Sequence, residues 1–419
     1  MTSRTIRRSV AALVATGLVL AACGDDDDSD DTPADTEAPA GTEAPADTDT
    51  PADTDTPADN EAPAGTEAME GEDAAAVTLA EVCPETVVIQ TDWFPEAEHG
   101  ALYEMVGDDY EIDDNNLIVR GSLVTDGGAN DTGVDIEVRS GGPAIGDQTV
   151  AAVVYADPSI TLGYANTEAQ VLQTDTPMIS VVAPLEINPQ IIYWDPDTYP
   201  EFETLADLGE AGVEINVYAG GTFSEVFVGN GTWTDDQVNP SYDGSPARFI
   251  AENGAIAQQG FASAEPYSYE FEFEEWGKPV AYQTLHDAGF QVYSQTIAVP
   301  ADKLEELSPC LTELVPVIQQ AAIDYVSDPA RANGIILDAV ETFDTFWVYS
   351  EGLASFSAEV QAEQGLVGNG PDGTVGNMDE ARIQGVIDQI RDDAGLDVPA
   401  DLVAADLFTN EFIDESIGF

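Results

Sequence analysis

The stretch Val87–Tyr103, with the sequence VVIQTDWFPEAEHGALY, places the tightest constraint on the fold. Its apolar run Val87–Ile89 is typical of a buried strand, a polar loop with two aromatic residues follows, and the end has helical character. Strand, loop and helix in this order form the repeating unit of α/β folds, in which ligands bind at the carboxyl ends of the strands. The sequence therefore predicts an α/β fold with a ligand site at this loop.

The first 23 residues have the pattern of a secretory signal. Three arginines precede a short apolar stretch, Val10–Val19, which is too short to span a membrane. Leu20–Cys23, with the sequence LAAC, then matches a bacterial lipoprotein cleavage box. We expect Cys23 to carry a lipid that holds the chain at the outer face of the cytoplasmic membrane. The alternative is an ordinary signal peptide with an incidental cysteine.

Residues 24–76 form a low-complexity tract rich in Asp, Glu, Thr, Pro and Ala, without Lys or Arg. We expect an extended acidic stalk, because the tract lacks the apolar side chains that would offset the entropy of ordering. The whole chain has 81 Asp and Glu against 11 Lys and Arg. This balance argues against nucleic-acid binding, and we interpret it as adaptation to a saline habitat. An anionic ligand would need backbone amides or one of the few arginines.

Two glycine-containing turns lie between an expected strand and an expected helix. Ser140-Gly141-Gly142 follows the expected strand Val134–Val138, and Gly220-Gly221-Thr222 follows the expected strand Val213–Tyr218. Backbone amides at such turns can bind anionic groups. A plain tight turn is the alternative in each case.

Other segments predict strands, a long loop and a run of helices. Leu117–Val119 and Phe290–Val299 are expected strands, Thr125–Gly133 an expected loop, and Tyr164–Thr174 an expected helix. After Pro300 the pattern is helical. We expect Ser308 and Pro309 to begin one helix, and Asn377 with Glu380 to form the capping box of another.

The pattern strand–D-W-F-P–x3–H–G-x-x-Y, from Asp92 to Tyr103, resembles the opening of ABC-importer substrate-binding proteins in the family that serves thiamine pyrimidine precursors, sulfonates and nitrate. The resemblance covers about residues 85–345. It implies a two-lobe, type II periplasmic-binding-protein-like fold with two crossing strands as a hinge. The implied organisation is lobe 1 in residues 77–184, lobe 2 in 185–290, and a return to lobe 1 in 291–419 with the C-terminal helices packed on it.

The resemblance also implies a function without catalysis or a cofactor. The chain would act as a monomer, capture a small organic solute and deliver it to ABC permease subunits. The favoured solute is an aminopyrimidine precursor of thiamine, with a sulfonate, nitrate or another small solute as alternatives. The segment Asp108–Asn130 departs from the family as an insert before the second cleft loop, so the cleft shape could differ.

We expect three kinds of ligand contact. Aromatic residues would stack on the solute, charged side chains would hydrogen-bond its nitrogens, and the two glycine-containing turns would hold any phosphate or carboxylate through their amides. A solvated surface position is the alternative for Glu265. The aromatic residues are Trp93, Phe94, Tyr103 and Tyr267; the charged ones are Glu98, His99 and Glu265; the turn residues are Ser140, Gly141, Gly142, Gly220, Gly221 and Thr222.

The remaining cysteines indicate the compartment of the protein, and the lysines help to decide whether it is a binding protein or an enzyme. Cys83 and Cys310 are expected to form a disulfide in an oxidising compartment, with two buried thiols as the alternative. The cysteines and histidines of the sequence do not have the spacing of zinc ligands. A pyrimidine-synthesising enzyme related to this fold uses a Lys-bound cofactor, but Lys278 and Lys303 lie outside the first cleft loops. A surface adhesin would share the lipid anchor and stalk but would not need the cleft loop.

Overall fold

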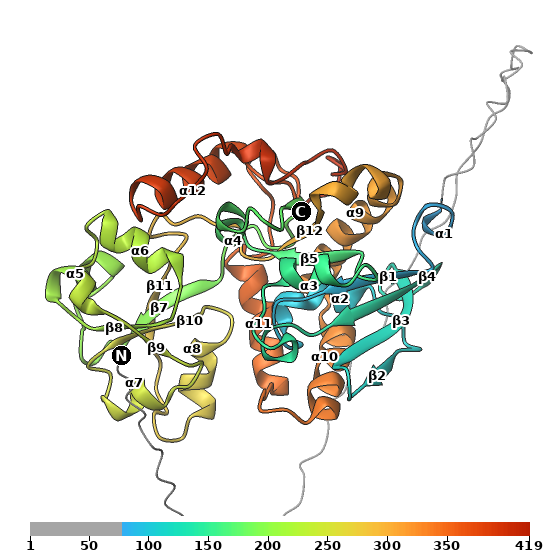
Figure 1. Cartoon of the computed structure of the whole chain (residues 1–419). Helices are drawn as coiled ribbons and strands as arrows, with labels where there is room; N and C mark the ends of the chain where they lie inside the picture. The colour runs from blue at the N-terminus through green and yellow to red at the C-terminus, as the bar shows by residue number, and fades with distance from the viewer. Residues whose placement is uncertain (1–77) are drawn as a thin grey trace, which may run out of the picture. The chain divides into compact units, whose positions relative to one another are not determined.

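The structure is a computed structural model that describes residues 78–419. These residues form two lobes, each built around its own β-sheet, which confirms the expected two-lobed α/β fold (Figure 1). The expected signal, the lipid on Cys23 and the stalk lie outside the described residues. Within residues 78–419, no helix combines the length and the apolar character needed to cross a membrane.

The first lobe contains a sheet of seven strands. Across it the order is β2 (Glu111–Asp113), β3 (Ile118–Thr125), β4 (Asn130–Arg139), β1 (Thr86–Gln90), β5 (Leu162–Ala165), β12 (Thr296–Pro300) and β6 (Met178–Val182). β1 runs parallel to both β4 and β5, whereas β12 runs antiparallel to β5 and β6. The carboxyl ends of β4, β1 and β5 therefore meet at one edge of the sheet, where the loop after β1 begins.

The segment Asp108–Asn130, expected to be an insert, lies at the edge of this sheet. This segment is a part of the sheet, because β2 and β3 form an antiparallel pair and β3 pairs with β4 in turn. The expected loop Thr125–Gly133 is mostly strand, since β3 extends to Thr125 and β4 begins at Asn130. A tight turn suffices because Asp126, Gly127 and Gly128 all adopt positive φ angles.

The second lobe contains a sheet of five strands. Their order is β11 (Ala281–Thr284), β7 (Gln190–Trp194), β10 (Ala257–Phe261), β8 (Ile215–Tyr218) and β9 (Val238–Tyr242). The chain enters this lobe after β6 and returns to the first sheet at β12. The returning strand is shorter than the predicted Phe290–Val299. Phe290 and Tyr293 instead pack in the core of the second lobe, so β12 begins only at Thr296.

The helices lie around the two sheets. Those before β12 are short: α1 (Leu79–Val82), α2 (Gly100–Glu104), α3 (Val150–Ala156), α4 (Thr167–Leu172), α5 (Leu205–Ala211), α6 (Thr222–Gly229), α7 (Ala247–Ala251) and α8 (Glu265–Tyr267). Those after β12 are longer: α9 (Leu304–Ser327), α10 (Ala330–Phe343), α11 (Glu351–Glu363) and α12 (Glu380–Asp392).

Three local predictions about helices were wrong. The first half of the expected helix Tyr164–Thr174 includes the end of β5, and α4 begins only at Thr167. Ser308 and Pro309 do not begin a helix but lie inside α9, which starts at Leu304 and also contains Pro316. The N-cap of α12 is Asp379 rather than Asn377, because Asp379 Oδ1 accepts a hydrogen bond of 2.8 Å from the Arg382 amide.

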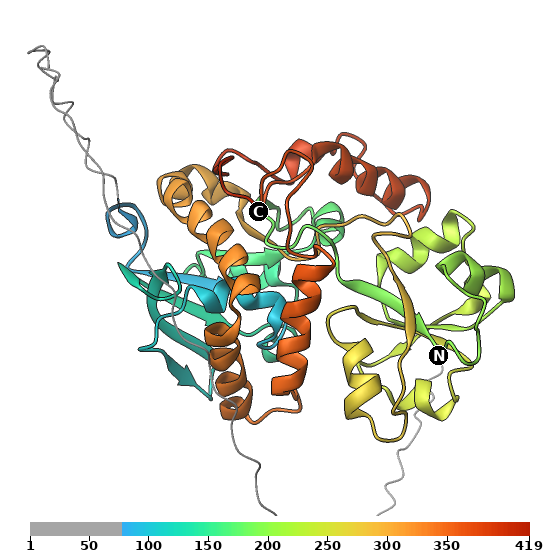
Figure 2. The same cartoon turned by 180° about the vertical axis from the view of Figure 1, so that it is seen from behind.

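The C-terminal helices do not all pack on the first lobe. α9 and α10 share its core, as expected, and α11 contributes to the cores of both lobes. In Figure 2, α11 is the deep-orange helix on the side of the first lobe that faces the second. α12 differs, because its apolar face is buried with Phe223 and Phe227 of α6 in the second lobe. The two helices approach so closely that a Cβ on Gly229 would lie 1.8 Å from the Asp393 carbonyl oxygen. The chain therefore passes between the lobes a third time.

A disulfide connects the start of the first lobe to helix α9. Cys83, which follows α1, is bonded to Cys310 of α9. The cysteines are 227 residues apart in sequence. A loop of this length corresponds to about 5 kcal/mol of stabilisation if the crosslink acts through the entropy of the unfolded chain.

Candidate functional site

The loop after β1 and the Ser140–Gly142 turn are in direct contact at the carboxyl edge of the first sheet. The Gly141 amide donates to the Trp93 carbonyl over 2.9 Å, and the Gln90 side chain donates to the Ser140 carbonyl over 2.9 Å. Gly142 has a φ of +57°, and a Cβ there would lie 2.4 Å from the Trp93 ring. Glycine is therefore required where the ring covers the turn.

Half of the backbone amides in the two glycine-containing turns already have partners in this structure. In the first turn, the amides of Ser140 and Gly141 donate to the carbonyls of Leu117 and Trp93. In the second turn, the Gly221 amide donates to the Tyr218 carbonyl over 3.3 Å. Because these donors already have partners, the expected anion-holding role is not supported for them. Gly220 is exposed and Thr222 begins α6, and the anion-holding role of these two residues stays a prediction.

The predicted aromatic contacts fall into different environments. Trp93 is half-buried and lies edge-on to Phe94 and Trp347, with ring centroids 6.0 and 5.9 Å away. Phe94 and Tyr103 are almost completely buried. Tyr103 belongs to the core of the first lobe and offers no open face, which contradicts its expected stacking role.

Tyr267 also differs from its predicted role. Its ring packs against Phe271 and against Phe356 of α11, with centroids 5.0 and 5.4 Å away, and its hydroxyl lies close to Gly352. These contacts make Tyr267 a packing residue between the second lobe and α11.

Four carboxyl groups lie close together where the lobes meet. Burial raises the pKa of Glu96 well above its usual value, and the charges of Glu98, Asp92 and Glu265 raise it further. Burial also raises the pKa of Glu98, and it raises that of Glu265 to about 7. His99 is fully buried among them, with Nε2 2.8 Å from Asp92 Oδ1 and 3.7 Å from Glu96 Oε1.

A chain of buried hydrogen bonds connects the lobes through Glu98. The Ser263 hydroxyl, which follows β10 in the second lobe, donates to Glu98 Oε1 in the first. The Ser357 hydroxyl of α11 donates to the Ser263 carbonyl. Tyr349 then links Ser357 to Ala97, through hydrogen bonds of 3.0 and 3.1 Å. These hydrogen bonds thus connect the first lobe, the second lobe and α11.

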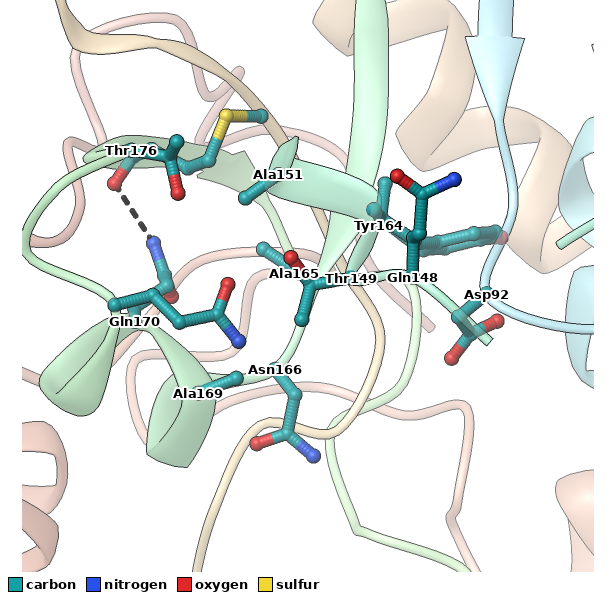
Figure 3. A pocket seen from close by; sticks show the side chains of 13 residues that line it. Asp92, Gln148, Thr149, Ala151, Tyr164, Ala165, Asn166, Ala169, Gln170 and Thr176 are labelled. Atoms are coloured by element: carbon teal, nitrogen blue, oxygen red, sulfur yellow. Dashed lines mark hydrogen bonds between the residues drawn. The ribbon is translucent and has the colours of Figure 1, made fainter. Parts of the chain in front are cut away.

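A cavity of about 220 Å³ opens beside Asp92 (Figure 3). It is formed by the start of α3, the end of β5 and α4, and Asp92 is the charged residue among the described residues that line it. The Tyr164 ring extends from β5 toward the loop that carries Asp92. The other lining residues are Gln148, Thr149, Val150, Ala151, Ala165, Asn166, Ala169, Gln170, Gln173, Thr176 and Met178.

Asp92 belongs to the sequence motif but was not predicted as a ligand contact. Tyr164 was missed as well, because it was expected in a helix, and Ser263 carries no motif. For Asp92 a signal was present: it is the first charged side chain after the strand. Among the described residues, no group of three or more His, Cys, Asp or Glu side chains is arranged to hold a metal ion.

Comparisons with known proteins give distant structural likenesses only. No protein-family model matches the sequence, and no curated protein is significantly similar to it. The ligand-binding component of an ABC-type import system from Staphylococcus aureus, solved with zinc bound, is 10% identical, with a TM-score of 0.48 over 78% of this chain and 98% of that one.

Two further solved structures belong to the same broad class. The alkanesulfonate-binding protein of Xanthomonas axonopodis pv. citri, bound to MOPS, is 13% identical, with a TM-score of 0.44 over 78% of this chain and 98% of that one. The periplasmic nitrate-binding protein of Synechocystis PCC 6803 is 13% identical, with a TM-score of 0.46 over 78% of this chain and 87% of that one. These likenesses are too remote to transfer a ligand.

Proposed function

We propose that this chain is the extracytoplasmic solute-binding component of an ABC importer. One observation carries the proposal: the loop after β1 contributes both to a cavity at the edge of the first lobe and to a buried contact with the second lobe. A solute held at this loop would favour the conformation in which the lobes are in contact. Such closure would remove the solute from water and present a distinct surface to permease subunits.

The finer assignment is a small organic solute with an aromatic, nitrogen-containing ring. The half-buried Trp93 would supply the stacking face, and Glu98, His99 and Glu265 would define the polar surroundings. An aminopyrimidine of the thiamine-precursor type has both features. A lipid on Cys23 would keep the protein at the outer face of the cytoplasmic membrane, close to its permease.

Replacement of Trp93 tests the site. In Trp93→Ala, we expect most solute binding to be lost while the unfolding temperature of the free protein changes little, because the ring is partly exposed. Co-purified solute would be identified by native mass spectrometry and its affinity measured by calorimetry. The control is Phe271→Ala, which removes an aromatic side chain that is 65% exposed in the second lobe. Unchanged affinity in Trp93→Ala would remove this residue from the site.

A thermal-shift screen separates a binding protein from a surface adhesin or a structural lipoprotein. A solute that binds the folded state raises its unfolding temperature in proportion to the logarithm of concentration over Kd. Stabilisation by one class of small solute is the expected result. A screen in which no small solute stabilises the protein would contradict the proposed function.

A further inference from the structure

We propose that the solute carries a positively charged nitrogen and that Asp92 is its counter-ion. The inference rests on the proposed function, since it names the chemistry of the solute that the same site would take. It comes from three observations on the described residues: the charge around the cavity, the kind of hydrogen-bonding atoms left without partners, and the pairing of the basic side chains.

The charge around the cavity is negative. Asp92 has a side chain that is 37% exposed and it lines the cavity, so a solute can reach it directly. Glu96, Glu98 and Glu265 lie close enough to interact electrostatically, but burial raises the pKa of each and so favours the neutral form. A cation in the cavity would thus be attracted mainly by the Asp92 carboxylate, in partly desolvated surroundings where charge interactions are stronger than in water.

Several buried polar atoms near Asp92 lack hydrogen-bond partners. His99 Nε2 donates to Asp92, because a carboxylate only accepts, and His99 Nδ1 is buried without a partner. Gln295 is 93% buried and its amide nitrogen lies 3.3 Å from Asp92 Oδ2, while its amide oxygen is also without a partner. The Tyr164 hydroxyl, buried against His99, lacks a partner as well.

A solute that suits this surrounding offers hydrogen-bond donors. An ammonium or amidinium group has several N–H donors and no acceptor, so it complements Asp92 and the other acceptors in charge and in hydrogen bonding. A sulfonate, nitrate or carboxylate offers acceptors only. It would place a negative charge next to Asp92 without a donor to balance it.

The basic side chains of the described residues are engaged elsewhere. Each Lys and Arg in residues 78–419 forms an ion pair with an acidic side chain outside the group around Asp92. Among residues 78–419, therefore, no Lys or Arg side chain is left to balance an anion beside Asp92. A cationic solute needs no rearrangement of these pairs.

The test compares solutes of one shape and different charge. The full-length protein would be screened by thermal shift against benzamidine, benzamide and benzoate, then against butylamine, butanamide and butanesulfonate, with nitrate as a small anion. We expect the cationic member of at least one set to raise the unfolding temperature, and the anions to have no effect. Calorimetry with that cation would then give its affinity.

The variant Asp92→Asn keeps the shape of the side chain and the acceptor for His99 but removes the charge. We expect the affinity for the cation to fall about tenfold or more, which is the ratio that corresponds to loss of one charge-assisted hydrogen bond. The matched control is Asp147→Asn, which makes the same charge change at an exposed residue beside the cavity-lining Gln148 and should leave the affinity unchanged.

The outcomes separate this inference from the proposed function. Preferential stabilisation by an anionic or neutral solute, or equal cation affinity in Asp92→Asn and the unmodified protein, would overturn the cationic solute and leave solute binding in place. A screen in which no solute of any charge stabilises the protein would overturn both.

Discussion

The buried hydrogen bond between Ser263 and Glu98 should control how tightly the lobes hold together. Ser263 is fully buried, and its hydroxyl donates to a Glu98 oxygen of the other lobe. Ser263→Ala removes the donor and leaves that oxygen buried without a partner. An unsatisfied buried group costs about 1 to 3 kcal/mol, so the ratio of closed to open molecules should fall by a factor of about 5 to 150.

Hydrogen exchange followed by mass spectrometry measures this change. In Ser263→Ala, we expect faster exchange in segments 97–104 and 257–264, by about the factor calculated above, and unchanged exchange in β3 and β4. The matched control is Ser268→Ala, because Ser268 is also buried and donates to a glutamate, Glu272, over 3.0 Å within the second lobe. Equal effects of the two variants, or no effect of Ser263→Ala, would refute an interlobe role for this bond.

Two further predictions concern the turn at Gly142 and the buried carboxyl groups. Gly142→Ala should destabilise the fold by more than the roughly 1–2 kcal/mol expected for a left-handed residue, because its Cβ would also meet Trp93. Urea unfolding should show a smaller loss of stability for Gly146→Ala, whose Cβ would enter open space. Equal losses in the two variants would contradict the packing argument. The pKa of Glu265 is raised to about 7, so stability should rise as pH falls from 8 to 5, by about 3 kcal/mol at most from this group. The urea concentration at the unfolding midpoint should rise in the same way as pH falls, and should depend less on pH in Glu265→Gln. A midpoint that falls on acidification would contradict this prediction.

The fold could be predicted because its signals are local or periodic. The apolar run before Asp92 identifies β1, and the helical pattern after Pro300 identifies most of the last third of the chain. The errors come from tertiary contacts. The apolar stripe of α12 shows that the helix buries one face, but the pattern does not say that Ile383 and Ile387 share a core with Phe223 and Phe227 of α6. The close approach at Gly229 and the hydrogen bonds from Arg382 to the Gln291 and Val292 carbonyls depend on the tertiary fold.

The candidate site shows the same division between local signals, which the sequence contains, and tertiary contacts, which it does not reveal. The motif indicated the loop from Asp92 to His99, which the structure places at the carboxyl edge of the first sheet beside a cavity. It did not indicate that Ser263, more than 160 residues further on, would contact Glu98. A lone serine carries no sequence signal, and its role depends on how the second lobe is placed.

In a chain with 81 acidic residues, acidity alone says nothing about a site. An acidic surface adapted to salt consists of solvated carboxylates, which cost little because water and counter-ions surround them. Glu96 and Glu98 are different, since burial raises the pKa of both and neither is paired with a Lys or Arg. A selection for salt tolerance gives no reason to bury unpaired carboxyl groups, which is costly. Their burial close to Asp92, where Glu98 contacts the second lobe, is therefore a feature of this site and not a result of the overall acidity of the chain.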